Sequence, residues 1–182
     1  MKRIFFVKTH HTTNYKMITQ AKSIILSLGS SLGEKDKILS SAIKDINKII
    51  GKVTSISKTY ETEPWGFEDE NIFHNLAIKI STKQQPETIL KNIHQIEKKH
   101  HRTHTKTGYE ARTLDIDIIF YENEIISTNE LTIPHKYAHL RKFVLQPIMD
   151  IDKNIKHPTE NKTIEELYYL CPDKTTIKPV NI

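Results

Sequence analysis

RTLDIDIIFYENE, residues 112–124, has the leucine, isoleucines and aromatic residues of a β-strand, yet two aspartates, Asp115 and Asp117, interrupt the apolar run. Residues two apart in a strand point to the same face, with Cα atoms about 6.6 Å apart. The two carboxylates therefore share one face, while Ile116 and Ile118 occupy the other. The pattern predicts a strand with one face in the core and two negative charges on the opposite face.

The two aspartates could hold a cation or could simply face solvent. Carboxylates about 5 Å apart repel each other by about 3 kcal/mol at an effective dielectric constant near 20. A cation between them converts the repulsion into binding, and magnesium commonly uses one or two carboxylates together with substrate phosphate oxygens. Ile119 and Tyr121 continue the face of Asp115 and Asp117, so that face is not simply polar, and the strand alone leaves both interpretations open.

The segments before the acidic strand predict the fold class. Apolar residues spaced three and four apart indicate helices, and short apolar or alternating runs indicate strands. We expect, in order, a strand at 23–28, a helix within 34–50, strands at 52–60 and 75–81, and a helix within 85–102. With the acidic strand this gives the β-α-β-β-α-β order of the ferredoxin-like arrangement, an α+β fold with helices packed against an antiparallel sheet. A C-terminal extension follows, with proline-punctuated loops and a short helix near 163–170.

Length and composition indicate a single domain. The chain has 182 residues, 37% hydrophobic and 27% charged, enough for one substantial core. We expect the domain to span 22–182 and residues 1–21 to form an N-terminal extension outside the core, within which Met17 is a candidate for the true start. The one cysteine, Cys171, excludes an internal disulfide framework and suits a reducing cytoplasm, and we expect it to be a packing residue. No stretch approaches the roughly 20 apolar residues of a membrane span.

The chain is basic, with a formal net charge of +5 and ten histidines. This charge suits an anionic partner such as a nucleotide or nucleic acid, or serves solubility. A basic run, KKHHRTHTK at 98–106, lies just before the acidic strand, and Arg112 follows it. Cations beside a magnesium site could neutralise a polyphosphate, although a solvated helix end with favourably placed cations explains the run as well.

The segment ETEPWGFEDENIFHN, residues 61–75, holds an aromatic-rich loop of a length typical of binding loops. Its aromatic side chains suit stacking on a flat ring, or they could pack onto the core. The turn GSSLGEK, residues 29–35, has three residues between its glycines and no GK[ST], so it is not a Walker A phosphate loop.

Five stretches together carry a resemblance to a known family: LSLGSSLGEK, YETEPWGFEDENIFHNLAIKI, IEKKHHR, ARTLDIDIIFYENEII and LTIPHKYAHLRKFVLQPIMDI. They resemble the 6-hydroxymethyl-7,8-dihydropterin pyrophosphokinases of folate biosynthesis over roughly residues 23–171. The most specific piece is RTLDIDII followed by LTIPH at the expected distance.

The resemblance implies transfer of a pyrophosphoryl group from ATP to the hydroxymethyl oxygen of the dihydropterin, with release of AMP and without a protein nucleophile. It implies that two magnesium ions are bound by Asp115 and Asp117. These two residues, Arg102 and Arg112 are the implied catalytic residues. The pterin-binding residues implied are Thr62, Trp65, Phe73, Asn75 and Phe143. The ATP-binding residues implied are Glu97, Arg102, Arg112, Ile118, Thr132, His135 and Arg141. His104 and Tyr109 depart from the family, which often carries arginine and tryptophan there.

Two alternatives use the same features. A two-metal nuclease or phosphatase could use the aspartates, but such sites usually assemble more carboxylates, and the aromatic loop would be unexplained. An RNA-binding module of ferredoxin-like fold would need aromatics on the sheet face, and NLAIKIS at 75–81 has none. We expect a cytoplasmic monomer that binds ATP and the pterin as small molecules, with no nucleic acid or membrane partner.

Overall fold

The computed structural model describes residues 20–64, 71–100 and 113–180. The predicted elements are present, together with additional short ones. In chain order they are β1 (Lys22–Ser30), α1 (Lys35–Ile49), β2 (Lys52–Ile56), β3 (Tyr60–Thr62), β4 (Phe73–Thr82), α2 (Pro86–Lys99), β5 (Asp115–Tyr121), β6 (Ile126–Ser127), β7 (Thr132–Ile133), the 3-10 helix η1 (Ala138–Leu140), α3 (Lys142–Asp152), α4 (Ile164–Leu170) and β8 (Ile177–Pro179).

The main sheet is antiparallel and has six strands, with the order β5-β1-β4-β3-β8 and with β2 also paired to β4. β3 pairs with the beginning of β4, and β2 pairs with its end. The central strands β1 and β4 are therefore flanked by the acidic strand on one side and by β2 and β3 on the other. This is the predicted ferredoxin-like α+β arrangement, which the structure confirms.

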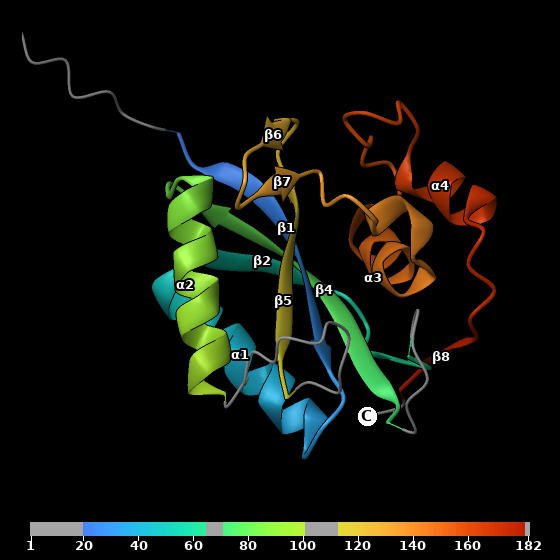
Figure 1. Cartoon of the computed structure of the whole chain (residues 1–182), viewed down its shortest axis with the longest axis horizontal. Helices are drawn as coiled ribbons and strands as arrows, with labels where there is room; N and C mark the ends of the chain where they lie inside the picture. Colours follow the sequence, from blue (N-terminus) through green and yellow to red (C-terminus); the bar gives the residue numbers. More distant parts are fainter. Residues whose placement is uncertain (1–19, 65–70, 101–112, 181–182) are drawn as a thin grey trace, which may run out of the picture.

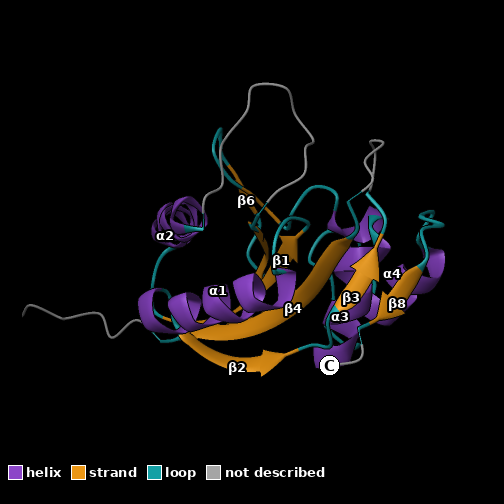
Figure 2. Ribbon diagram, turned by 90° about the horizontal axis from the view of Figure 1, so that it is seen from below, coloured by secondary structure: helices purple, strands orange, loops and turns teal. Residues whose placement is uncertain are grey.

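Helices cover both faces of the sheet, with α1 and α2 on one face and α3 and α4 on the other (Figure 1, Figure 2). The larger core lies under α1 and α2, where alternate residues of the strands meet the helix stripes, among them Leu26, Leu28, Ile78, Ile93, Ile96, Ile116 and Ile118. The second core lies under α3 and α4 and contains Ile25, Ala77, Ile119, Phe120, Val144, Leu145, Ile148 and Cys171. Cys171 is thus a buried packing residue, as predicted, and burial raises the pKa of its thiol.

A β-bulge in β5 corrects the expectation that Ile119 and Tyr121 both continue the face of the aspartates. Ile25 of β1 pairs with Phe120 and the next residue, Leu26, pairs with Ile118, so Ile119 is an extra residue. Ile119 stays on the α3 side, as predicted. Tyr121 is instead turned into the core under α1 and α2.

Two further predictions were incomplete. The expected strand at 52–60 is divided into β2 and β3 at residues 57–59. The expected C-terminal extension also contains a helix that was not predicted, α3, which continues through Pro147. Its buried side chains Val144, Leu145 and Ile148 follow helical spacing, and their packing against the sheet outweighs the hydrogen bond that proline cannot donate.

Nothing in the described ranges forms a helix of the length and hydropathy needed to cross a membrane. The predicted N-terminal extension, 1–21, falls almost entirely outside the described residues.

Candidate active site

A pocket of about 470 Å³ is lined by residues of β1, β3, β4 and β5, of α2, and of the segment from β7 to the start of α3. Its volume is within the usual range for small-molecule sites. Every predicted site residue that the structure describes lines this pocket: Thr62, Phe73, Asn75, Glu97, Asp115, Asp117, Ile118, Thr132, His135, Arg141 and Phe143. The other predicted site residues, Trp65, Arg102 and Arg112, lie outside the described residues, as do His104 and Tyr109.

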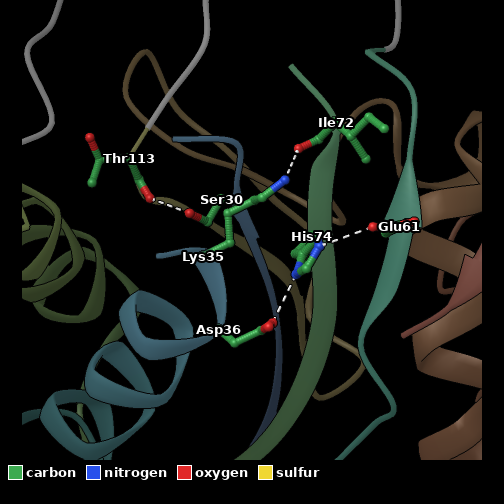
Figure 3. Close-up of polar contacts among 7 residues, drawn as sticks. All are labelled: Ser30, Lys35, Asp36, Glu61, Ile72, His74 and Thr113. Atoms are coloured by element: carbon green, nitrogen blue, oxygen red, sulfur yellow. Dashed lines mark hydrogen bonds and ion pairs between the residues drawn. The ribbon is translucent and has the colours of Figure 1, made fainter. Parts of the chain in front are cut away.

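The acidic strand presents both aspartates to the pocket because its neighbour β1 carries small residues opposite them. Asp115 pairs with Gly29, and Asp117 pairs with Ser27. All four residues line the pocket. Just before the strand, the buried hydroxyl of Ser30 donates a hydrogen bond to the Thr113 carbonyl over 2.7 Å (Figure 3). This contact ties the start of β5 to the end of β1.

The aspartates form a pair rather than a complete metal cage. Within the part of the chain that is described, no group of three or more histidine, cysteine, aspartate or glutamate side chains could enclose a metal ion. Two carboxylates on one strand face nevertheless fit magnesium, which takes few protein ligands and completes its shell with water and substrate phosphates. The residues present fit that ion when a polyphosphate supplies further oxygens.

His135 is held beside the aspartates by the bulge. Its backbone N–H donates to the carbonyl of Ile119, the extra residue of β5, over 3.1 Å. Burial, with the Arg141 guanidinium nearby, lowers the pKa of His135 to about 4, although Asp115 opposes the shift. The imidazole is therefore neutral at pH 7, and its contact of 4.0 Å with the Asp117 carboxylate is not an ion pair at that pH.

Glu97 reaches the acidic strand from α2. The side chain is 1% exposed, and its Oε1 atom accepts a hydrogen bond from the Ile116 N–H over 2.9 Å. Among the described strands β5 lies at the edge of the sheet, so none of them pairs with this N–H on its outer side. Glu97 thus supplies a hydrogen-bond acceptor for this backbone N–H, directly behind the aspartates.

At the other end of the pocket, Asn75 is fixed by two neighbours. Its Nδ2 atom donates to the Thr62 hydroxyl over 2.7 Å, and both side chains are buried. Its Oδ1 atom lies over Gly29, where a Cβ would approach it to 2.8 Å. Phe73 and Phe143 line the same pocket from β4 and α3. This end therefore combines an oriented amide with two aromatic rings.

Arg141 precedes α3 and is 7% exposed. Its guanidinium carbon lies 5.4 Å from the Tyr137 ring centre and 5.7 Å from that of Phe143. Both contacts are cation–π distances. They hold a positive charge between the aromatic end and the acidic strand.

Sequence reasoning missed several lining residues, chiefly Ser27, Gly29, Leu90, His94, Lys136 and Tyr137. Two signals could have found some of them. Leu90 and His94 lie seven and three residues before Glu97, which is the same face of one helix. Ser27 and Gly29 alternate along β1 as the aspartates alternate along β5.

Comparison with known proteins agrees with this geometry. The family model described as 7,8-dihydro-6-hydroxymethylpterin-pyrophosphokinase matches residues 25–153. A 2-amino-4-hydroxy-6-hydroxymethyldihydropteridine pyrophosphokinase of Aquifex aeolicus is 31% identical over 157 residues, which is 86% of this chain and 94% of that protein. The enzyme of the same name from Bacillus subtilis is 34% identical, over 78% of this chain and 85% of the relative.

Some relatives are longer. A folic acid synthesis protein of Pneumocystis carinii is 35% identical over 87% of this chain, but the match spans only 21% of its length. Among solved structures, a fused HPPK-DHPS protein in complex with substrates superposes with a TM-score of 0.68 at 18% identity, over 84% of this chain and 43% of that one. This likeness concerns the fold. The family model and the two full-length relatives show that the chain belongs to the 7,8-dihydro-6-hydroxymethylpterin-pyrophosphokinase family, the folate-synthesis enzymes that its sequence resembles.

Proposed function

We propose that this chain transfers a pyrophosphoryl group from ATP to the hydroxymethyl group of 6-hydroxymethyl-7,8-dihydropterin in the pocket described above, and that AMP is the second product. The observation that carries the proposal is the arrangement of one pocket with two ends. An oriented amide and two phenylalanines lie at one end, and a carboxylate pair with a neighbouring arginine lies towards the other.

The carboxylates of Asp115 and Asp117 would hold two magnesium ions. Magnesium bound by these carboxylates would supply positive charge that neutralises the ATP phosphates. The strand geometry supports this role because both carboxylates face the pocket while Ile116 and Ile118 are anchored in the core. The positions of the two aspartates are therefore set by the backbone of β5 and by the core packing of Ile116 and Ile118.

The pterin would bind between Phe73 and Phe143, with its heteroatom edge on Asn75 and Thr62. An amide can donate and accept at the same time, which suits the alternating donors and acceptors of a pterin. Asn75 is held from two sides, so little ordering of its side chain would accompany binding. Trp65 would complete this end.

ATP would extend from the acidic strand towards α2 and β7. Glu97, Ile118, Thr132 and His135 would line its nucleoside part, and Arg141 with Arg102 and Arg112 would face the phosphates. Because His135 is neutral at pH 7, it would act there as a hydrogen-bonding group, while the arginines supply fixed charge.

The proposed chemistry depends on positioning and charge rather than on a protein nucleophile. Holding the hydroxymethyl oxygen in line with the β-phosphorus supplies much of the rate enhancement in such reactions. We further propose that the chain works as a monomer. We place its work in the cytoplasm, where ATP is available.

The test is the identity of the nucleotide product. Purified protein is incubated with ATP and magnesium, with and without the dihydropterin, and nucleotides are separated by chromatography. We expect AMP, only when the pterin and magnesium are both present, in a 1:1 ratio to the pterin diphosphate. Release of ADP or of free phosphate would refute the proposal and would favour a phosphatase or nuclease use of the same aspartates.

A further inference from the structure

His74 lies between Phe73 and Asn75 in β4, but its side chain points to the opposite face of the sheet, away from the pocket. The residue is 7% exposed. Its Nδ1 atom is 2.8 Å from Oδ1 of Asp36, in the first turn of α1. Its Nε2 atom is 3.5 Å from Oε1 of Glu61, its cross-strand partner in β3. A single imidazole thus contacts two carboxylates from two other elements (Figure 3).

A second contact joins the same turn of α1 to the same strand. The Nζ atom of Lys35 donates to the carbonyl of Ile72, immediately before β4, over 2.8 Å (Figure 3). Lys35 and Asp36 are adjacent, and they bind Ile72 and His74, which flank Phe73. The beginning of β4 is therefore tied to α1 on both sides of a residue that lines the pocket.

The strand that carries Thr62, β3, lies between β4 and β8 in the sheet. β3 has three residues, and it pairs with β4 through Tyr60–Asn75, Glu61–His74 and Thr62–Phe73. Side chains alternate between the two faces, so Thr62, Phe73 and Asn75 line the pocket while Glu61 and His74 meet behind it. The contact between Glu61 and His74 is thus the side-chain link between these strands directly behind the pterin end.

We propose that His74 is a positioning residue for the pterin, acting with Asp36 and Glu61 as a polar clip behind the binding surface. The clip fixes β3 and the start of β4 against α1, and so fixes the spacing of Thr62, Phe73 and Asn75. The Asp36 carboxylate accepts a hydrogen bond from Nδ1 of His74, while Nε2 faces the Glu61 carboxylate at 3.5 Å, a contact in which Nε2 donates when both ring nitrogens carry a proton. This inference rests on the proposed function of the pocket.

The test compares His74→Leu with Thr82→Val. Thr82 lies at the other end of β4, where its buried hydroxyl donates to the Ile50 carbonyl at the end of α1 over 2.6 Å. Both substitutions thus remove a buried polar tie between α1 and β4, at opposite ends of the strand. We expect His74→Leu to raise KM and Kd for the dihydropterin about tenfold and to change KM for ATP by less than about twofold, since small displacements of positioning groups are costly. Thr82→Val should leave both KM values unchanged even where it lowers the Tm.

A double-mutant cycle with Asp36 then tests the clip itself. Asp36→Ala should reproduce most of the His74→Leu effect on dihydropterin binding, and the double variant should be no worse than His74→Leu alone. Asp36→Asn keeps an acceptor for the imidazole and should recover much of the loss. Additive effects of the two single substitutions, or equal changes in KM for both substrates, would overturn the inference.

Failure of the inference can be distinguished from failure of the proposed function. Dihydropterin binding is measured by calorimetry with a non-hydrolysable ATP analogue present, so no turnover is needed. If wild-type protein binds no dihydropterin, the proposed function fails. If wild-type protein and His74→Leu bind it equally well, the function stands and the clip is refuted.

Discussion

The side-chain oxygen of Asn75 occupies the space that a side chain at position 29 would need. A Cβ on Gly29 would lie 2.8 Å from Oδ1 of Asn75, closer than real Cβ contacts allow. The two residues are paired across β1 and β4. Glycine at this position is therefore required by the close approach of the amide, while the other side of that amide is held by Thr62.

Gly29→Ala should impair the pterin end of the site. The added methyl group forces the Asn75 amide away from its position, and we expect KM for the dihydropterin to rise about tenfold or more. Steady-state kinetics with each substrate varied in turn will measure the change. The Asn75→Ala background supplies the control, because removal of the amide removes the clash. Gly29→Ala should then add little, and a full effect in that background would contradict the stated cause.

Ser30→Ala should weaken the metal-dependent step. The Ser30 hydroxyl holds the Thr113 carbonyl two residues before Asp115, and its loss leaves a part-buried carbonyl without this donor, at a typical cost of about 1 kcal/mol. We expect the magnesium concentration for half-maximal activity to rise several-fold. The readout is a magnesium titration at saturating ATP and dihydropterin.

Ser57→Ala is the control for this experiment. Ser57 also bonds backbone groups through its hydroxyl, accepting from the Ala77 N–H and donating to the Lys58 carbonyl, but it lies outside the pocket lining. Its magnesium titration should match that of the wild type. An unchanged titration for Ser30→Ala would mean that Thr113 does not position the acidic strand.

His157 should make the fold less stable as the pH falls. The ring is 3% exposed, and its Nδ1 atom accepts from the Thr159 and Glu160 N–H groups, so the structure binds the neutral form. Burial lowers the pKa of His157, with His139 contributing. The unfolded chain therefore takes up a proton from about pH 6.5 downwards, where the folded chain does not. The unfolding free energy should fall by at most about 1.4 kcal/mol per pH unit for this group.

Urea unfolding of wild-type protein and His157→Asn at pH 5.0 to 8.0 checks this expectation. Asparagine keeps an acceptor for the two N–H groups but does not titrate. The two stability curves should run parallel above about pH 7 and converge towards acid pH, below the unfolded-state pKa. Curves that stay parallel to pH 5 would show that His157 does not titrate differently on folding.

The order of elements could be predicted because it rests on local periodicity. Residues Ile89, Ile93 and Ile96 mark a helix face in the sequence and are buried in the structure. The acidic strand could likewise be assigned from alternation alone. Tyr121 was placed on the wrong face because an extra residue, Ile119, shifts the alternation. No pattern within one strand reveals a bulge, since the bulge is defined by the register with its partner.

Site residues could be predicted where the functional group of the side chain indicates its role. They could not be predicted where the role depends on contacts across the sheet. Asp115 and Asp117 could be chosen for their functional groups, whereas Asn75 was reached through the family resemblance. Gly29 and His74 contribute through what they touch across the sheet, and neither contact can be read from spacing along the chain. Helix α3 was not predicted, although the apolar residues around Pro147 follow helical spacing.

The central claim is that the Asp115 and Asp117 carboxylates carry the magnesium-bound ATP. Asp117→Asn keeps the size of the side chain, removes one metal-binding charge and relieves the repulsion from Asp115. The decisive measurement is AMP formation by wild-type protein and Asp117→Asn with saturating ATP, dihydropterin and magnesium, alongside thermal unfolding of both. We predict that the rate falls by about 10³-fold or more, as expected when a catalytic metal ligand is lost, while the Tm is unchanged or higher. Near-normal AMP formation by a folded Asp117→Asn variant would contradict the account.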